Sequence, residues 1–242
     1  MSPTERTDIF PSTHATWLHT RIESVCDTNT ATSALAAREL REHLMLRYHK
    51  PLCAYVRGSS LRTLGEPEEL VHEFFARALA DDMFLVRWKA RGNPLRRWMM
   101  NGLLLHARGV VRDRARNREY SGKNPSVIDS IAQSSEPSAE QAFESAWAMA
   151  MLDAACQDVQ DLFAKDDRAQ AFDIFRKHVI DGKSYPEVHA QLGVDPVRCA
   201  TEVRAVTRAL RDSLLERLRE DGVTGESIDA EVSAILRLIG QT

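Results

Sequence analysis

Residues 93–118 read NPLRRWMMNGLLLHARGVVRDRARNR, which predicts one long amphipathic helix. Asn93 is a favourable N-cap and Pro94 suits the first helical position, so the helix is expected to begin there. At about 1.5 Å per residue its length would be roughly 40 Å. Its buried face, at helical spacing, would comprise Leu95, Trp98, Met99, Gly102, Leu103, His106 and Val110. A second stripe that stays in water would comprise Arg97, Asn101, Arg108, Arg112 and Arg116.

The same stretch concentrates positive charge. From Arg87 to Lys123 the chain has eleven Lys and Arg residues and two acids, a local charge of +9, although the formal net charge of the whole chain is −3. A long helix with an apolar seam, an exposed tryptophan candidate (Trp98) and a cationic tail suits a phosphate backbone and unstacked bases. The alternative is a solvated basic helix, because charge runs are common on protein surfaces.

The composition predicts a soluble cytoplasmic protein. Its 242 residues suffice for one large domain or two small ones, and 43% hydrophobic with 28% charged residues is ordinary for a globular chain. The N-terminus lacks the apolar core of a signal peptide, and no apolar run approaches the roughly 20 residues of a membrane span. The cysteines are far apart without a CxxC pair, which indicates reduced thiols rather than disulfides or a zinc site: Cys26, Cys53, Cys156 and Cys199.

Helical patterns also surround the basic stretch. Helices are expected over residues 16–25 and 33–58, with Pro51 kinking or dividing the second. A short element is expected over residues 83–90. Residues 120–138 are rich in Gly, Pro, Asn and Ser with little periodicity, and they form a predicted linker.

A helix with an acidic beginning is expected over residues 66–82. Glu66, Glu68 and Glu69 lie in its first turn, where the helix dipole favours acids. This acidic group is either a solvated helix end or a surface that docks a protein. Phe74 and Phe75 would then be either core residues or part of that contact. The expected core face comprises Leu70, Phe74, Phe75, Ala78 and Leu79.

After the linker, helices are expected over residues 137–164 and 168–180. Ser184 and Glu187 then form a capping-box pattern, and the short helix that they begin would end at Gly193, because glycine is the usual left-handed residue there. A longer helix would begin at Asp195 and run to about Arg219. A short helix, a glycine turn and a longer helix have the spacing of a helix-turn-helix.

The end of the chain completes an all-helical pattern. A last helix over residues 227–239 would cover the C-terminal domain, and no strand pattern is evident. Residues 124–167 have nine acids and one base, a local charge of −8. This acidic stretch is either a solvated surface or a segment that keeps the second domain off DNA in the free protein.

Motifs of enzymes are missing from the sequence. It has no glycine-rich phosphate loop, no HExxH, no GxSxG and no paired carboxylates in a distinctive setting. The histidines are scattered, and His72 and His189 lie within amphipathic patterns where a structural role is expected. We therefore predict no catalytic residue, no metal site and no cofactor.

Three segments of the first half resemble region 2 of extracytoplasmic-function (ECF) sigma factors. They are REHLMLRYHKPLCAYVRG (41–58), EPEELVHEFFARAL (66–79) and RGNPLRRWMMNGL (91–103), and they are most similar to the planctomycete-type groups. ESAWAMAMLDAA (144–155) and SYPEVHAQLGVDPVRCATEVRAVTRALRDSLL (184–215) resemble region 4, and the tail from Ser227 is similar to the C-terminal extension of those groups. The resemblance spans about residues 15–240.

This resemblance implies an all-α protein of two helical domains joined by a flexible linker. Region 2 would occupy residues 13–118, the linker 119–138 and region 4 residues 139–221, with the helix-turn-helix at 184–211 and the extension at 222–242. The implied partners are core RNA polymerase, through its β′ clamp helices and β flap, and promoter DNA. The resemblance also admits an anti-sigma factor or a regulatory kinase as a partner.

Three sets of site residues follow from the resemblance. Polymerase binding is implied for Glu66, Glu68, Glu69, Leu70, Glu73, Phe74 and Arg77. Binding and melting of the minus-ten element are implied for Arg97, Trp98, Asn101, Arg108, Arg112, Arg114 and Arg116. Binding of the minus-thirty-five element in the major groove is implied for Arg198, Thr201, Glu202, Arg204, Ala205 and Arg208.

The sequence departs from the family pattern at several of these places. The Arg-Phe that follows the glycine is Asn93-Pro94 here, and a small Ala of the helix-turn-helix is His189. Basic or polar positions of the minus-ten helix are replaced by Leu104, Leu105 and Val110. The Lys-x-x-x-His-Arg of the recognition helix becomes Ala200, Arg204 and Ala205, with Glu202 nearby, and a carboxylate facing phosphate opposes binding although it can accept from cytosine.

The prediction from the sequence is a sigma factor that is not itself an enzyme, and polymerase binding is better supported than minus-thirty-five reading. Two alternatives stay open. The first is a stand-alone helix-turn-helix regulator, which would dimerise and bind duplex DNA without polymerase. The second is a sigma-like adaptor that binds polymerase or another protein but no longer reads DNA, and the weakened recognition helix favours it over the first.

Overall fold

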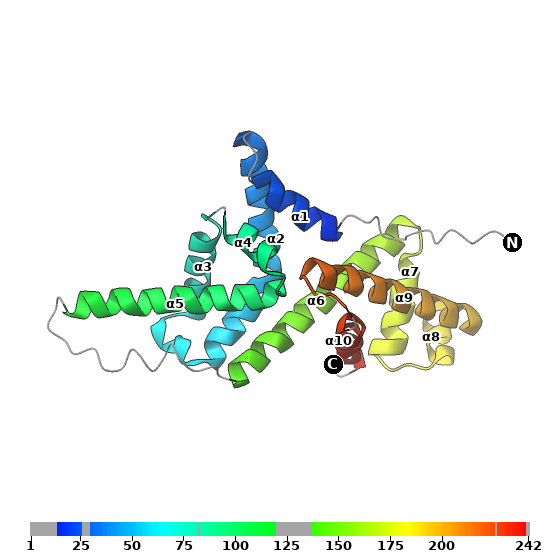
Figure 1. Ribbon diagram of the computed structural model, residues 1–242. Coiled ribbons are helices and arrows are strands. Elements are labelled where there is room, and N and C mark those ends of the chain that lie inside the picture. The colour runs from blue at the N-terminus through cyan, green and yellow to red at the C-terminus, as the bar shows by residue number, and fades with distance from the viewer. Residues whose placement is uncertain (1–13, 26–29, 82, 120–136, 226, 241–242) are drawn as a thin grey trace. The chain divides into compact units, whose positions relative to one another are not determined.

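The computed structural model describes residues 14–25, 30–81, 83–119, 137–225 and 227–240 (Figure 1). These residues form ten α helices and no strand, which confirms the predicted all-α class for the described part of the chain. The chain divides into two compact units, one formed by residues 18–150 and the other containing residues 151–240. The division falls inside α6 (Pro137–Lys165), whose first half therefore belongs to the first unit.

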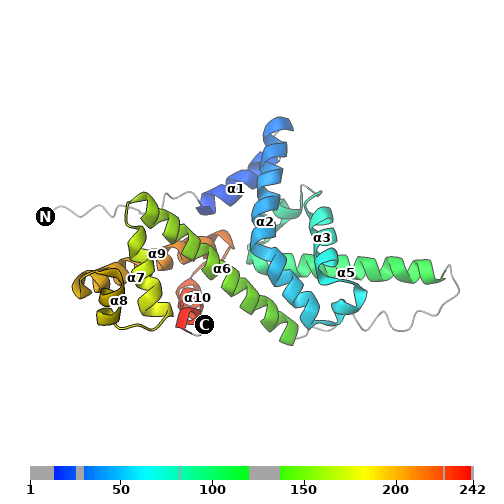
Figure 2. The ribbon, with the colours of Figure 1, turned by 180° about the vertical axis from the view of Figure 1, so that it is seen from behind.

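Five helices and a 3-10 turn precede α6. Their bounds are α1 (His14–Val25), α2 (Thr30–Gly58), η1 (Ser60–Leu64), α3 (Pro67–Ala78), α4 (Met83–Arg91) and α5 (Leu95–Glu119). Pro51 lies inside α2 without dividing it. Seen from both sides, α2 packs against α3 and also against α5 (Figure 2). Tyr48 and Tyr55 of α2 and Phe74 and Phe75 of α3 fill the core between them.

Helix α5 begins one residue later than predicted. The Pro94 carbonyl accepts the backbone N–H groups of Arg97 at 3.1 Å and of Trp98 at 3.2 Å. The Asn93 carbonyl instead accepts a hydrogen bond from the indole N–H of Trp88 at 2.7 Å. This contact fixes the turn between α4 and α5. The sequence pattern therefore identified the start of the helix to within one residue.

The buried face of α5 differs from the predicted one in its second half. The fully buried residues follow four-residue steps: Leu95, Met99, Leu103, Ala107 and Val111, with Met100 beside them. Trp98, His106 and Val110 are only half-buried. The prediction was wrong there because Val110 and Val111 are both apolar, and the small Ala107, rather than the bulky His106, lets the neighbouring elements approach.

The second unit is built around α9. Its elements after α6 are α7 (Ala169–Phe175), the π-helical turn η2 (Arg176–Ile180), α8 (Tyr185–Leu192), α9 (Pro196–Glu220), α10 (Ser227–Leu236) and the 3-10 turn η3 (Arg237–Gly240). Helices α7, α8 and α10 all pack against α9. Val232 and Ile235 bury the inner face of α10, as expected for a helix that covers the unit.

Polar contacts join α6 to α9 within this unit. The Arg217 guanidinium donates to both carboxylate oxygens of Asp158, at 2.9 Å from Nε and 2.8 Å from Nη2. The Ser213 hydroxyl donates to the same carboxylate at 2.8 Å. A two-pronged Arg–carboxylate pair fixes orientation as well as distance, so the start of the unit is tied firmly to its longest helix.

Candidate nucleic-acid interfaces

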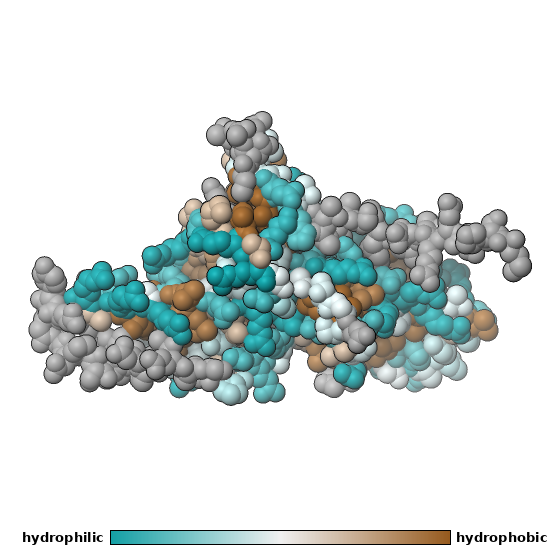
Figure 3. Space-filling model, viewed as in Figure 1, coloured by the Kyte–Doolittle hydropathy of each residue, from teal (hydrophilic) through white to brown (hydrophobic). Residues whose placement is uncertain are grey.

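One face of α5 carries exposed cations. The side chains of Arg97, Asn101, Arg108, Arg112 and Arg116 are all exposed, as the predicted wet stripe requires, and Arg114 is exposed on another face of the helix. Figure 3 shows hydrophilic residues over the C-terminal half of this helix. Leu105 lies within the stripe, between Asn101 and Arg108, and is 65% exposed. This face can follow a phosphate backbone, and it contains one apolar side chain that can meet a base.

Trp98 is less exposed than the sequence suggested. Its ring packs against Phe84, with 5.5 Å between the ring centroids, and the Arg91 guanidinium carbon lies 5.5 Å from the centre of the indole. These contacts hold the half-buried ring beside α4. Trp98 is therefore only partly accessible to a partner.

Acidic residues of α6 meet the first turn of α5 inside the first unit. Glu144 pairs with Arg96, at 3.2 Å between Oε2 and Nε, and the Arg96 guanidinium lies 4.3 Å from the centre of the Trp147 ring. Glu140 lies 4.0 Å from Arg97, whose side chain is still 52% exposed. Arg96 is thus a packing residue, whereas Arg97 stays accessible.

The predicted polymerase-binding helix, α3, presents a polar outer face. Glu66, Glu69, Glu73 and Arg77 are exposed, and Glu68 is half-buried in an ion pair with Arg57. Leu70 and Phe74 are buried, at 4% and 2% exposure. Their side chains join α3 to the core, so they do not reach the surface of this structure.

His106 connects the outer faces of α3 and α5. Its Nε2 lies 3.8 Å from a carboxylate oxygen of Glu73. Burial and the charge of Arg77 lower the pKa of His106, and Glu73 only partly offsets them. The imidazole is therefore neutral at pH 7, and it adds no charge to the cationic stripe.

The helix-turn-helix has the predicted caps. The Glu187 carboxylate accepts the Ser184 backbone N–H at 2.8 Å and the Ser184 hydroxyl at 2.6 Å. These hydrogen bonds, together with the charge of Lys183, lower the pKa of Glu187. Gly193 ends α8 with a φ of 68°, and the Asp195 side chain accepts the backbone N–H of Val197 at 2.9 Å. The turn and both helix starts are therefore defined by local sequence.

His189 takes the place of a small residue without separating the helices. Its side chain is exposed, and its Nδ1 lies 2.9 Å from the Val194 carbonyl oxygen in the turn. The helices meet instead through Val188 and Cys199, both fully buried. His189 thus contributes a hydrogen bond that closes the turn between α8 and α9.

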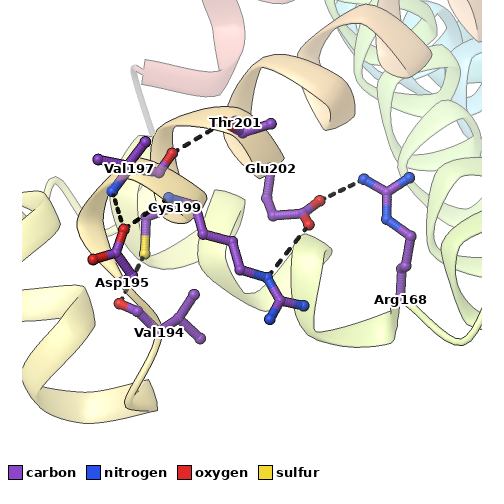
Figure 4. A network of polar contacts seen from close by, with 8 residues as sticks. Arg168, Val194, Asp195, Val197, Cys199, Thr201 and Glu202 are labelled. Carbon is purple, nitrogen blue, oxygen red and sulfur yellow. Dashed lines mark hydrogen bonds and ion pairs between the residues drawn. The ribbon is translucent and has the colours of Figure 1, made fainter.

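Most of the predicted minus-thirty-five residues are accessible. Arg198, Thr201, Arg204 and Arg208 are exposed, and Ala205 is half-buried. Glu202 is different, because it is only 8% exposed. Its carboxylate accepts a hydrogen bond from Arg168 Nη2 at 2.6 Å and lies 3.9 Å from Arg198 Nε (Figure 4). The carboxylate therefore faces its own unit rather than the outer face of α9, where the half-buried Asp212 lies one turn after Arg208.

Val197 of α9 is exposed but was not among the predicted site residues. Val197 is 76% exposed and lies one turn before Thr201 on the same face. Its spacing relative to Thr201, Arg204 and Arg208 is the helical series i, i+4, i+7 and i+11, which could have identified it.

The cysteines have no reactive setting among the described residues. Cys53, Cys156 and Cys199 are free, and Cys26 lies outside the described residues. Burial raises the pKa of the Cys53 and Cys156 thiols to about 11 and also raises that of Cys199. Within the described ranges, no group of three potential metal ligands comes together, and no helix is long and apolar enough to cross a membrane.

No protein-family model, no curated protein and no solved structure matches the chain. The grounds for assigning a function are therefore the exposed cationic faces of α5 and α9 and the acidic face of α3.

Proposed function

We propose that this protein is a sigma factor of the ECF type, which binds core RNA polymerase and directs promoter recognition and opening. The observation that carries the proposal is that each compact unit exposes a cationic helix face, α5 in one and α9 in the other. A protein that opens promoters needs both, because one unit must hold a separated strand while the other binds duplex DNA. No catalytic group is required of it.

The first unit would contain region 2, assigned to residues 13–118. The stripe from Arg97 to Arg116 would follow the phosphates of the non-template strand at the minus-ten element. Exposed Glu66, Glu69 and Glu73 on α3 would meet the β′ clamp helices of the polymerase. Opposite charge across such a contact favours fast and specific association.

The second unit would contain most of region 4, assigned to residues 139–221 after a linker at 119–138, whereas residues 139–150 lie in the first unit. Its helix-turn-helix would place α9 in the major groove of the minus-thirty-five element, near the β flap. The residues 222–242 would be the C-terminal extension. The inward position of Glu202 supports DNA binding by α9, since this carboxylate pairs with Arg168 and does not face the phosphates.

Two other functions compete with this one. A stand-alone helix-turn-helix regulator would leave the long cationic stripe of α5 unexplained. A sigma-like adaptor would bind polymerase without reading DNA. One reason to favour it was a carboxylate at position 202 facing phosphate, but the Glu202 carboxylate pairs with Arg168 instead. An anti-sigma factor or a kinase remains a proposed regulator, and the cytoplasm is the proposed location.

Co-purification with core RNA polymerase tests the proposal. The full chain should retain bacterial core polymerase on a column, and Glu69→Lys with Glu73→Lys should abolish retention because both side chains are exposed on α3. Glu42→Lys is the matched control, since it reverses an exposed charge on α2 of the same unit. No retention by the unmodified chain would overturn the proposal, and retention by the double variant would overturn the assigned surface.

A further inference from the structure

One exposed stripe of α9 changes character along its length. Val197, Thr201, Arg204 and Arg208 are all exposed and recur at helical spacing. The opposite face of the helix is buried, through residues such as Cys199, Val206 and Leu210. The stripe therefore points away from the unit, with an apolar side chain at its N-terminal end, cations farther along, and the half-buried Asp212 one turn after Arg208.

The first two turns of this stripe offer carbon atoms rather than hydrogen-bonding groups. The Thr201 hydroxyl donates to the Val197 carbonyl at 3.0 Å (Figure 4), so the polar group of this exposed side chain is engaged by its own helix. The Asp195 side chain accepts the backbone N–H groups of Val197 at 2.9 Å and Arg198 at 3.3 Å. The backbone N–H groups of Val197 and Arg198 at the helix start therefore already have hydrogen-bond partners.

Charged side chains near this end lie off the stripe. Glu202 points toward Arg168, as Figure 4 shows, and its carboxylate is buried. Arg198 lies about a quarter of a helical turn from Val197, with its Nε 3.9 Å from Glu202. Val197 and Thr201 are therefore the exposed, uncharged side chains of the stripe at its N-terminal end.

We infer that Val197 and Thr201 recognise the C5-methyl groups of thymine in the major groove of duplex DNA. This inference rests on the proposed function, and it names the bases that α9 reads. Thymine is the base that presents a methyl group in that groove, and apolar side chains recognise it there. Arg204 and Arg208, on the same stripe, would hold the phosphates and fix the register.

The spacing of the two side chains suits neighbouring base pairs. Val197 and Thr201 are four residues apart, or about 6 Å along the helix axis. Successive bases of one strand rise by about 3.4 Å, so the two side chains span about two base pairs. We expect thymines at two nearby positions of the bound duplex.

Replacement of thymine by deoxyuridine tests the inference, because deoxyuridine lacks only the methyl group. Duplexes with a randomised segment are first selected for binding by the full chain with core RNA polymerase, and each thymine of the selected duplex is then replaced in turn. Loss of one buried methyl should weaken binding by about fourfold at the contacted positions. Val197→Ala and Thr201→Ser should bind the thymine duplex about as weakly, and each should lose its sensitivity to deoxyuridine at one position.

Thr207→Ser is the matched control. The Thr207 hydroxyl donates to the Val203 carbonyl at 2.8 Å, just as that of Thr201 donates to the Val197 carbonyl, but Thr207 lies off the stripe. This variant should keep the full sensitivity to deoxyuridine. If deoxyuridine weakens binding at no position, or weakens all variants equally, the inference is overturned while the proposed function stands. If no duplex is selected and polymerase is not retained, both are overturned.

Discussion

Phe74 of α3 packs its ring directly against Gly102 of α5. A Cβ atom at position 102 would lie 2.9 Å from Cε2 and 3.1 Å from Cζ of Phe74, closer than real side chains approach. The ring of Phe74 is buried and also contacts the ring of Phe84. The centroids of the Phe74 and Phe75 rings are 5.5 Å apart. The absence of a side chain at Gly102 thus sets the distance between the acidic helix and the cationic helix.

Gly102→Ala should destabilise the protein relative to Gly109→Ala. Both substitutions add the same helix propensity to α5, but only position 102 faces a ring, since nothing lies within 4 Å of a Cβ at Gly109. Overpacking should lower the free energy of unfolding of Gly102→Ala by about 1–3 kcal/mol relative to the Gly109 variant. Urea unfolding followed by circular dichroism measures the difference. Equal stabilities would show that the ring moves away at no cost.

Glu202→Gln should loosen the start of α9. The carboxylate is buried and accepts a charge-assisted hydrogen bond from Arg168. The substitution removes the charge of a buried hydrogen-bond acceptor, so we expect a loss of about 1–3 kcal/mol in unfolding free energy. The partial exposure of Arg168 to solvent keeps the loss from being larger. Asp229→Asn, which removes the exposed partner of Arg211, should cost less than about 1 kcal/mol. A cost for Glu202→Gln no larger than that of the control would contradict a structural role for the pair.

Arg112→Ala and Arg116→Ala should weaken the binding of fork-junction promoter DNA by the complex with core polymerase. Each lost phosphate contact should reduce the slope of log affinity against log salt by about one unit. Arg38→Ala on α2 is the control, because that exposed arginine pairs with Glu42 and lies outside the stripe. An unchanged salt slope for both α5 variants would remove this helix from the DNA interface.

Cys53 and Cys156 should react slowly with iodoacetamide in the native protein. Burial raises their thiol pKa values to about 11 from an ordinary value of 9.0, so at pH 8 the thiolate fraction should be about a hundredfold below that of an unperturbed thiol. Because the pKa is raised, the rate should increase about tenfold per pH unit up to about pH 11. Mass spectrometry of single-cysteine peptides follows each site, and fast labelling at pH 8 would contradict the buried position of Cys53 and the half-buried position of Cys156.

Local sequence predicted most of the helix boundaries, because capping depends on neighbouring residues. Ser184, Glu187, Gly193 and Asp195 all have the expected roles. The π-helical turn after Phe175 was not anticipated. It depends on a backbone hydrogen bond from Asp181 to the Arg176 carbonyl at 2.9 Å, which extends the ring of the ordinary helix by one residue.

Features that depend on distant residues could not be read from the chain. Glu202 turns inward because Arg168, which is 34 positions away, supplies a partner. Phe74 is a core residue because Gly102 leaves room for its ring, and the sequence alone left core and contact equally open. The polar faces of α3 and α5 follow from helical spacing, whereas the buried register of α5 depends on which neighbours pack against it.

Transcription from a genomic DNA library by core RNA polymerase, with and without this protein, tests the central claim most directly. Our account predicts discrete new start sites that require the protein and are lost in the Arg112→Ala, Arg116→Ala double variant. Retention of polymerase without new start sites would indicate an adaptor. Absence of both polymerase binding and new start sites would contradict the account and leave a helix-turn-helix regulator that acts alone.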